Sequence, residues 1–225
     1  MGVQFIPSII GMNLMNVESQ IRQLNKYAKM YHLDIIDWHF AENMSVSPTL
    51  IEQLRPLTDA ELDVHLMVQG PPLSIIEACI KAGADTICVH AEDAQRNIFK
   101  FISTIHDAGK KIGVVLNPAT PLSVMQHYLN EVDEVTFMGV TPGFTQQKLV
   151  PVVLDKIRDA LRLREEKGYP FTTLIDGGCH KSTMKAVYET GVENIVMGAT
   201  VLFSHGPDMD VAWQKMTEDF EAWTR

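Results

Sequence analysis

The feature that most constrains the fold of this 225-residue chain is a repeated alternation of short apolar runs with longer amphipathic runs. The short runs have the length of strands, whereas apolar residues in the longer runs recur at helical spacing. We expect eight strands, at residues 4–10, 32–36, 62–68, 85–90, 111–117, 134–140, 171–176 and 194–198. We expect helices at residues 14–29, 48–54, 71–82, 94–108, 148–167, 181–190 and 208–223, and a further one after Pro121.

Continuous alternation of strands and helices indicates a parallel sheet, because each crossover carries a helix. Eight such units predict an α/β fold of the closed (β/α)8 type, a TIM barrel, as a single domain over residues 1–225. The alternative is an open, doubly wound sheet, which usually has a glycine-rich loop after its first strand. The corresponding segment here, "SIIGMN", lacks the GxGxxG pattern, so the barrel is favoured.

The charge and the cysteine content of the chain restrict the binding partners and the cellular compartment that we expect. A formal charge of -9 and a pI near 5.3 argue against a nucleic-acid backbone as partner. The three cysteines, an odd number without a CxxC pair, indicate free thiols in a reducing compartment. We see neither a signal-peptide pattern nor about 18 consecutive apolar residues, so we expect no membrane span and a cytoplasmic location.

Polar residues gather at the ends of the predicted strands, where barrels of this type carry their active sites. They are Ser8, His32, Asp34, His65, His90, Asn117 and Asp176. His32 and Asp34 share one strand face, since alternate residues of a strand point the same way. Together with His65 and Asp176 they provide two imidazoles and two carboxylates, a set that suits Zn, Mn, Fe or, less well, Mg. A metal-free polar network is the alternative.

A second group of residues lies in glycine-containing loops after the last three strands. These loops are "TPGFTQQ" (141–147), "DGGCH" (176–180) and "MGAT" (197–200). Glycine allows the backbone to approach a ligand closely, and loops after strands seven and eight commonly bind phosphate in such barrels. The loops together predict a phosphate site, whereas any one of them alone could be a plain tight turn.

The ordered motifs "PSI", "HLDIID", "DVHLMV", "GVVLNPATP", "VTPGF", "IDGG" and "MGATVLF" together resemble the ribulose-phosphate 3-epimerase family of metal-dependent TIM barrels. The resemblance implies that His32, Asp34, His65 and Asp176 bind one divalent metal. It implies that Asp34 and Asp176 also serve as the acid/base pair that inverts carbon 3 of a phosphorylated ketose through an enediolate. It further implies a homo-oligomer, a dimer or hexamer, and these substrate-binding residues: Ser8, Met67, Met138, Gly143, Gly177, Gly178 and Gly198.

The chain departs from the family pattern in two loops. Trp38 stands where the family usually has glycine, and 145–147, "TQQ", replaces the usual Gly-Gly-Gln or Ala-Gly-Gln. A tryptophan cannot replace glycine where a positive φ is needed. We therefore expect a reshaped loop after the second strand and an altered phosphate grip after the sixth.

Other segments, "SVSP" (45–48) and "LFSHGPDMDVAWQKM" (202–216), resemble the D-allulose-6-phosphate 3-epimerase branch of the family. The preferred hypothesis is therefore conversion of D-allulose 6-phosphate to D-fructose 6-phosphate. The alternative is conversion of D-ribulose 5-phosphate to D-xylulose 5-phosphate. Two further hypotheses are a metal-free phosphate-binding barrel, such as a lyase or synthase, and a non-catalytic sugar-phosphate-binding barrel.

Overall fold

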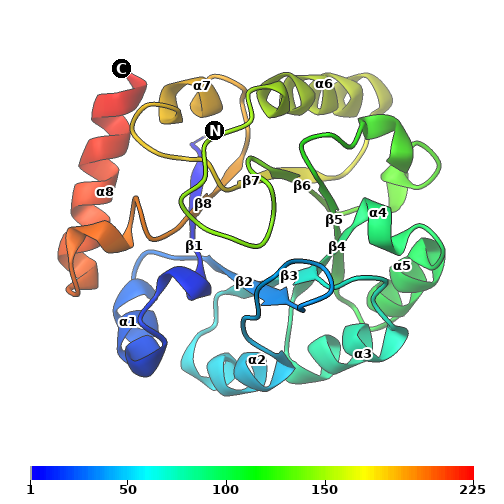
Figure 1. Ribbon diagram of the computed structural model, residues 1–225, viewed down its shortest axis with the longest axis horizontal. Helices are drawn as coiled ribbons and strands as arrows, with labels where there is room; N and C mark the ends of the chain where they lie inside the picture. The colour runs from blue at the N-terminus through cyan, green and yellow to red at the C-terminus, as the bar shows by residue number, and fades with distance from the viewer. Residues whose placement is uncertain (1) are drawn as a thin grey trace.

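A ring of eight parallel strands forms the centre of the computed structural model, which describes residues 2–225 (Figure 1). Neighbouring strands pair in the order β1-β8-β7-β6-β5-β4-β3-β2, and a parallel bridge between Ser8 and His32 closes the ring between β1 and β2. This confirms the predicted barrel. The strands are β1 (Gln4–Pro7), β2 (Met30–Ile36), β3 (Glu61–Met67), β4 (Thr86–His90), β5 (Lys111–Leu116), β6 (Glu134–Met138), β7 (Thr172–Asp176) and β8 (Asn194–Met197).

Helices surround the ring on its outer side (Figure 1). They are α1 (Val17–Leu24), α2 (Pro48–Leu54), α3 (Leu73–Ala82), α4 (Ala91–Ala94), α5 (Ile98–Asp107), α6 (Val152–Lys167), α7 (Met184–Tyr188) and α8 (Met209–Thr224). Short 3-10 turns lie in the connections, at η1 (Ile9–Gly11), η2 (Leu14–Asn16), η3 (Arg55–Leu57), η4 (Leu122–Met125), η5 (Leu129–Glu131) and η6 (Phe203–His205).

Two predicted helices differ from the structure. The helix expected after Pro121 is wrong, because that connection contains only the 3-10 turns η4 and η5. The segment mixes good and poor helix formers and is short, so tertiary packing decides its conformation. The helix expected at 14–29 begins as the 3-10 turn η2 and ends as α1 at Leu24, where the Asn25 side chain donates a hydrogen bond to the Leu57 carbonyl.

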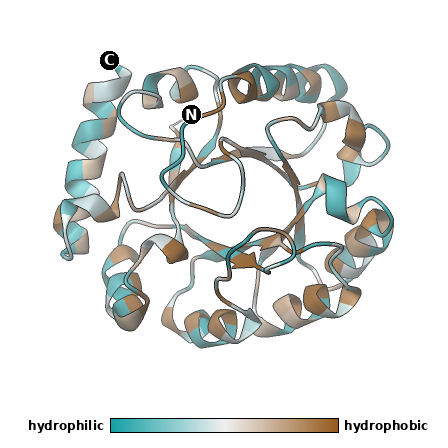
Figure 2. Cartoon of the chain, viewed as in Figure 1, coloured by the Kyte–Doolittle hydropathy of each residue, from teal (hydrophilic) through white to brown (hydrophobic). Residues whose placement is uncertain are grey.

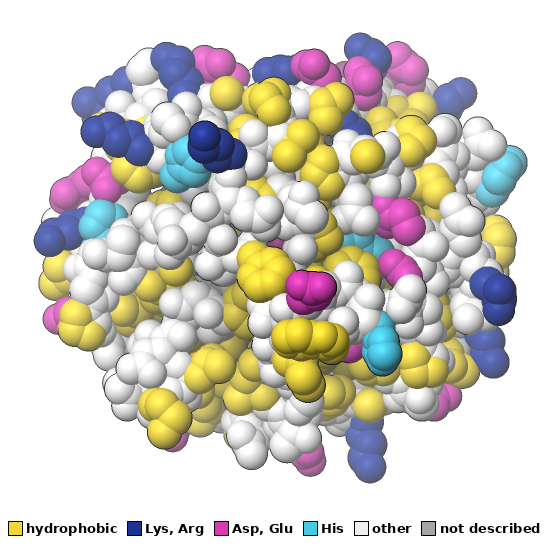
Figure 3. Space-filling model, in the orientation of Figure 1, with side chains coloured by type: hydrophobic (Ala, Val, Ile, Leu, Met, Phe, Trp, Pro, Cys, Tyr) yellow, Lys and Arg dark blue, Asp and Glu magenta, His cyan; other side chains and the backbone are white. Residues whose placement is uncertain are grey.

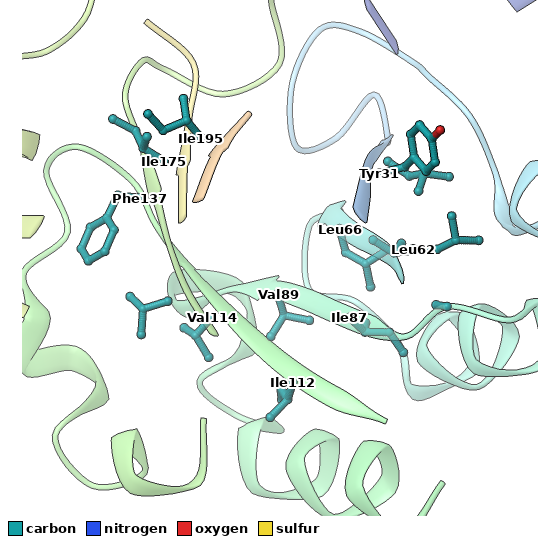
Figure 4. Packing of buried hydrophobic residues seen from close by; sticks show 14 of the residues in the cluster. Tyr31, Leu62, Leu66, Ile87, Val89, Ile112, Val114, Phe137, Ile175 and Ile195 are labelled. Atoms are coloured by element: carbon teal, nitrogen blue, oxygen red, sulfur yellow. The ribbon is translucent and has the colours of Figure 1, made fainter. Parts of the chain in front are cut away.

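Alternation along the strands separates two cores. Side chains such as Leu62, Leu66 and Ile87 point outward and pack in the layer between the strands and the helices (Figure 4). The strands carry mostly hydrophobic residues, whereas the helices show polar outer surfaces (Figure 2). The intervening residues of the same strands, such as Asp63 and His65, point into the barrel. The interior of the barrel therefore contains buried polar groups, whereas the outer face of the sheet packs against the helices through hydrophobic residues.

Two smaller predictions are confirmed, the glycine that ends a helix and the free cysteines. Gly83, with φ of +102°, ends α3, as the glycines before the strands predicted. The three cysteines are free and buried. None of the helices within residues 2–225 has the length together with the hydrophobicity that crossing a bilayer requires.

Candidate active site

Strand register brings the predicted polar residues together inside the barrel. On β2 and β3, Asp34 lies beside His65, and His32 lies beside Asp63. On the other side of the ring, the last residue of β7, Asp176, lies beside the last residue of β6. Because all strands are parallel, their carboxyl ends meet at one mouth of the barrel, and these side chains converge there.

The four predicted metal ligands form one compact cluster. The Asp34 Oδ1 atom lies 3.2 Å from His32 Nε2 and 3.1 Å from His65 Nδ1. The Asp176 Oδ2 atom lies 3.8 Å from each of the same two nitrogens. Each residue thus offers one ligand atom, and the four atoms lie within 4.8 Å of one another. The sequence prediction that His32, Asp34, His65 and Asp176 converge is correct.

Burial and neighbouring charges shift the pKa values of the four clustered residues in opposite directions. Burial alone would raise the pKa of Asp34, but the adjacent imidazoles of His32 and His65 outweigh burial and hold that pKa well below its usual range. Burial raises the pKa of Asp176, and the neighbouring Asp34 carboxylate adds to the effect. Burial lowers the pKa of His65, whereas two aspartates overcome burial and raise the pKa of His32.

Each imidazole has a partner on the side opposite the cluster. His32 Nδ1 donates to the Asp63 carboxylate, with the nitrogen 2.6 Å from Oδ2. His65 Nε2 lies 2.9 Å from His90 Nε2. These contacts fix the ring orientations, so that His32 Nε2 and His65 Nδ1 both face the two carboxylates.

The donor set fits a divalent cation. His32 Nε2 is buried and has no hydrogen-bond partner among the described residues, although its other nitrogen is satisfied. Two imidazole nitrogens and two carboxylate oxygens are the ligands that Zn, Mn and Fe accept in proteins. The four residues could therefore hold one such ion, as a single cluster at the floor of the barrel mouth.

A pocket opens directly above this cluster. Nine residues predicted to act in catalysis or substrate binding line it: Ser8, Asp34, Met67, Met138, Gly143, Asp176, Gly177, Gly178 and Gly198. His32 and His65 are fully buried and lie beneath the lining. The pocket is therefore bounded by the two carboxylates below, by buried methionines on the side, and by the glycine loops above.

The loop after β7 requires glycine for its shape. Gly177 and Gly178 have φ of +86° and +74°, a region that other residues rarely adopt. A Cβ on Gly178 would lie 2.9 Å from the Leu149 Cα, so the loop also packs too closely for a side chain. This geometry lets the backbone itself form the wall of the pocket.

The two loops that depart from the family pattern contact each other at the mouth. Asn43 Nδ2 donates to the Gly143 carbonyl at 2.7 Å, which joins the β2–α2 loop to the β6–α6 loop. Trp38 is 60% exposed and does not adopt a positive φ; among residues 2–225, Gln146 is the one non-glycine residue that does. Hydrophobic side chains gather near the centre of this face (Figure 3). Gln146 and Phe144 line the pocket, so the altered β6–α6 loop still borders it.

Sequence reasoning missed some residues of the site. Asp63 stands two residues before His65, the same spacing as His32 and Asp34, so its inward direction was predictable from the pattern. His90 was noted as polar but was given no role. Its contact with His65 depends on ring orientation, for which the sequence carries no signal.

Comparison with known proteins agrees with this geometry. The model of the ribulose-phosphate 3 epimerase family matches residues 4–202. The ribulose-phosphate 3-epimerase of Bacillus subtilis (strain 168) is 39% identical over 201 residues, which cover 88% of this chain and 92% of that protein. The chloroplastic ribulose-5-phosphate-3-epimerase of Arabidopsis thaliana is 36% identical over 197 residues, covering 87% of this chain and 70% of that protein.

Solved structures support the fold alone. A mutant tryptophan synthase α-subunit from Pyrococcus furiosus superposes with a TM-score of 0.70 at 13% identity, covering 97% of this chain and 98% of that chain. At that identity, the likeness reports a shared barrel and carries no argument about the reaction.

Proposed function

The chain belongs to the ribulose-phosphate 3-epimerase family of sugar isomerases, and from this premise we propose that it interconverts D-ribulose 5-phosphate and D-xylulose 5-phosphate. The observation that carries the proposal is the pair Asp34 and Asp176, which converge with two imidazoles at the floor of a glycine-walled pocket. The relatives described above are named for ribulose phosphate, and they support this substrate better than D-allulose 6-phosphate, the preferred hypothesis from the sequence.

Inversion at carbon 3 needs a proton removed from one face of the sugar and returned on the other. Asp34 and Asp176 reach the pocket from strands on different sides of the ring. In our mechanism one carboxylate takes the proton from carbon 3, leaving an enediolate, and the other carboxyl group gives its proton to the opposite face. Each turnover removes one proton and returns one proton, so the overall reaction consumes none, and the two groups exchange roles in the reverse direction.

The remaining residues position the substrate. Met67 and Met138 are 3% and 2% exposed, and they form a dry wall beside the reacting carbon. The loops that contain Gly177, Gly178 and Gly198 would hold the phosphate through backbone amides, remote from the chemistry. Ser8 donates a hydrogen bond of 3.4 Å to Asp34 Oδ2 and would also contact the substrate.

We assign His32, Asp34, His65 and Asp176 as ligands of one divalent metal. When bound, this cation supplies Lewis-acid stabilisation of the negative charge that develops on the substrate oxygens. The protein contributes the orientation of the four ligands, and it keeps both carboxylates aimed at the pocket.

A direct assay compares the two sugar phosphates on metal-loaded and chelator-treated protein. We expect metal-dependent epimerisation of both or of one, with the larger kcat/KM for D-ribulose 5-phosphate. A larger kcat/KM for D-allulose 6-phosphate would reverse the choice of substrate and restore the hypothesis from the sequence. Binding of both without turnover would replace the proposal by the non-catalytic barrel, and undiminished turnover without metal would remove the metal from the mechanism.

A further inference from the structure

His90 and Glu92 extend the polar network of the site beyond the four clustered residues. His90 is 1% exposed, and its Nε2 lies 2.9 Å from His65 Nε2. Its ring packs against Phe40, with the centroids 4.6 Å apart. On the far side, His90 Nδ1 lies 3.7 Å from Glu92 Oε2, and the hydroxyl of Thr120 donates to Glu92. The chain of contacts therefore runs from His65 through His90 to a carboxylate.

The two facing Nε2 atoms share a single hydrogen when both rings are neutral. If His90 donates, His65 Nε2 accepts, and the single N–H of the His65 ring is on Nδ1, facing Asp34. If His65 donates instead, His90 Nε2 accepts and His90 carries its hydrogen on Nδ1. Only the second arrangement places an N–H, rather than a lone pair, toward the Glu92 carboxylate.

We propose that His90, backed by Glu92, is a positioning residue that keeps the hydrogen of His65 on Nε2 and leaves Nδ1 as a bare acceptor. His65 Nδ1 and Asp34 Oδ1, 3.1 Å apart, are then two acceptors without a hydrogen between them. A cation that binds to both of these acceptors stabilises the arrangement. This inference rests on the proposed metal site, but it concerns the tautomer of the ligand and can be measured without turnover.

The two imidazoles of the cluster would consequently be held in opposite tautomers. His32 is bonded through Nδ1 to Asp63 and presents Nε2, whereas His65 is bonded through Nε2 to His90 and presents Nδ1. An acidic residue stands behind each of them, directly for His32 and through one further imidazole for His65. Removing a hydrogen-bond partner of a metal-ligating histidine typically weakens metal affinity by about 10-fold to 100-fold.

The test uses long-range proton–nitrogen NMR correlation of the full-length, 15N-labelled protein, which distinguishes the two tautomers of a neutral imidazole. We expect the Nε2–H form for His65 in the metal-free and the Zn²⁺-loaded protein. Zn²⁺ affinity is measured beside it, by competition with a chromophoric chelator. His90→Phe removes the acceptor and keeps a ring, so its Zn²⁺ dissociation constant should rise about 10-fold to 100-fold.

Two further variants separate positioning from loss of structure. His90→Gln can present an amide oxygen near the position of Nε2, and we expect it to recover most of the Zn²⁺ affinity that His90→Phe loses. Glu92→Gln should shift His65 toward the Nδ1–H form and weaken Zn²⁺ binding, whereas Glu77→Gln, an exposed residue on α3, should change neither. If His90→Phe does not fold, Glu92→Gln carries the test.

An Nδ1–H form of His65 in the wild-type protein would overturn the inference. So would unchanged Zn²⁺ affinity in both His90→Phe and Glu92→Gln. A wild-type protein that shows the Nε2–H form and binds Zn²⁺, but turns over neither sugar phosphate, would overturn the proposed function and support this inference.

Discussion

At the scale of single residues, each imidazole of the metal-ligand cluster has a partner on a neighbouring strand. His32 pairs with Asp63 and His65 with His90, so the two rings cannot turn away from the carboxylates. The inward direction of His32 and Asp34 was predictable, since it follows from a spacing of two along a strand. Which nitrogen faces which partner was not predictable, because that depends on the rotation of each ring in the packed interior.

The carboxylates allow the most direct test at this scale. Replacing Asp176 by asparagine keeps the size of the side chain but removes the group that gives or takes a proton. We expect kcat to fall about 10²-fold to 10⁴-fold while circular dichroism stays unchanged. Asp34→Asn should behave similarly, whereas Asp59→Asn, an exposed position, should retain wild-type kcat. Wild-type turnover in a folded Asp176→Asn protein would rule out the two-carboxylate mechanism.

Gly178 offers a test of the loop that borders the pocket. Alanine at this position would have to adopt a φ of +74° with its Cβ 2.9 Å from the Leu149 Cα. We expect Gly178→Ala to lower the free energy of unfolding by about 1–3 kcal/mol and to raise KM. Urea unfolding and steady-state kinetics measure the two effects.

Gly198→Ala is the matched control for that change. A Cβ there meets no atom within 4 Å, and Gly198 lines the same pocket. Its stability should therefore stay close to wild type while KM rises. Equal stability of the two variants would show that the conformation of Gly178 is not the constraint.

At the scale of elements, the barrel brings together loops that are far apart in the sequence. The strands were predictable because alternation, length and flanking glycines all agreed. The connection after β5 was not, since tertiary packing rather than periodicity decides whether so short a segment becomes an α-helix or 3-10 turns. The contact between the β2–α2 and β6–α6 loops also could not be predicted, because Asn43 and Gly143 lie in irregular loops that no periodicity places side by side.

That contact predicts a specific role for Asn43. Asn43→Ala removes a hydrogen bond worth about 0.5–1.5 kcal/mol between two loops at the mouth. Because both loops flank the pocket, KM should rise about 2-fold to 10-fold, with a smaller change in kcat. Asn130→Ala, at an exposed position in η5, serves as the control. An unchanged KM would mean that the joined loops do not shape substrate binding.

At the scale of the whole molecule, the barrel interior buries more acidic groups than the proposed reaction uses. Glu134 points into the barrel from β6 and is 3% exposed, and it accepts a hydrogen bond of 2.8 Å from the Thr136 hydroxyl. Burial, with a further contribution from the charge of Asp63, raises the pKa of Glu134 from 4.5 to about 8. Below about pH 8 the buried Glu134 side chain is therefore a neutral carboxyl group.

This burial makes stability depend on pH in a defined direction. Between pH 4.5 and about 8 the folded protein keeps a proton on Glu134 that the unfolded chain has lost. The stabilisation of the folded state by this proton is fully present below pH 4.5 and is lost as pH rises through about 8. Relative to wild type, Glu134→Gln should gain stability across this interval, at up to about 1.4 kcal/mol per pH unit.

Urea unfolding of both proteins at several pH values, in one metal-free buffer, provides the measurement. Glu131→Gln, at an exposed position, should show the same pH dependence as wild type. A constant difference between wild type and Glu134→Gln from pH 5 to pH 8 would contradict the prediction.

The proposed reaction depends on two carboxylates that exchange the proton on carbon 3 of a ketose phosphate. The most direct measurement is deuterium incorporation at carbon 3 of D-ribulose 5-phosphate in D₂O, followed by NMR on the metal-loaded protein. We expect deuterium to enter at carbon 3 and at no other carbon, in step with formation of D-xylulose 5-phosphate, and we expect Asp34→Asn and Asp176→Asn to lose this incorporation. Epimerisation without any deuterium at carbon 3, or full incorporation in both variants, would contradict the proposed reaction.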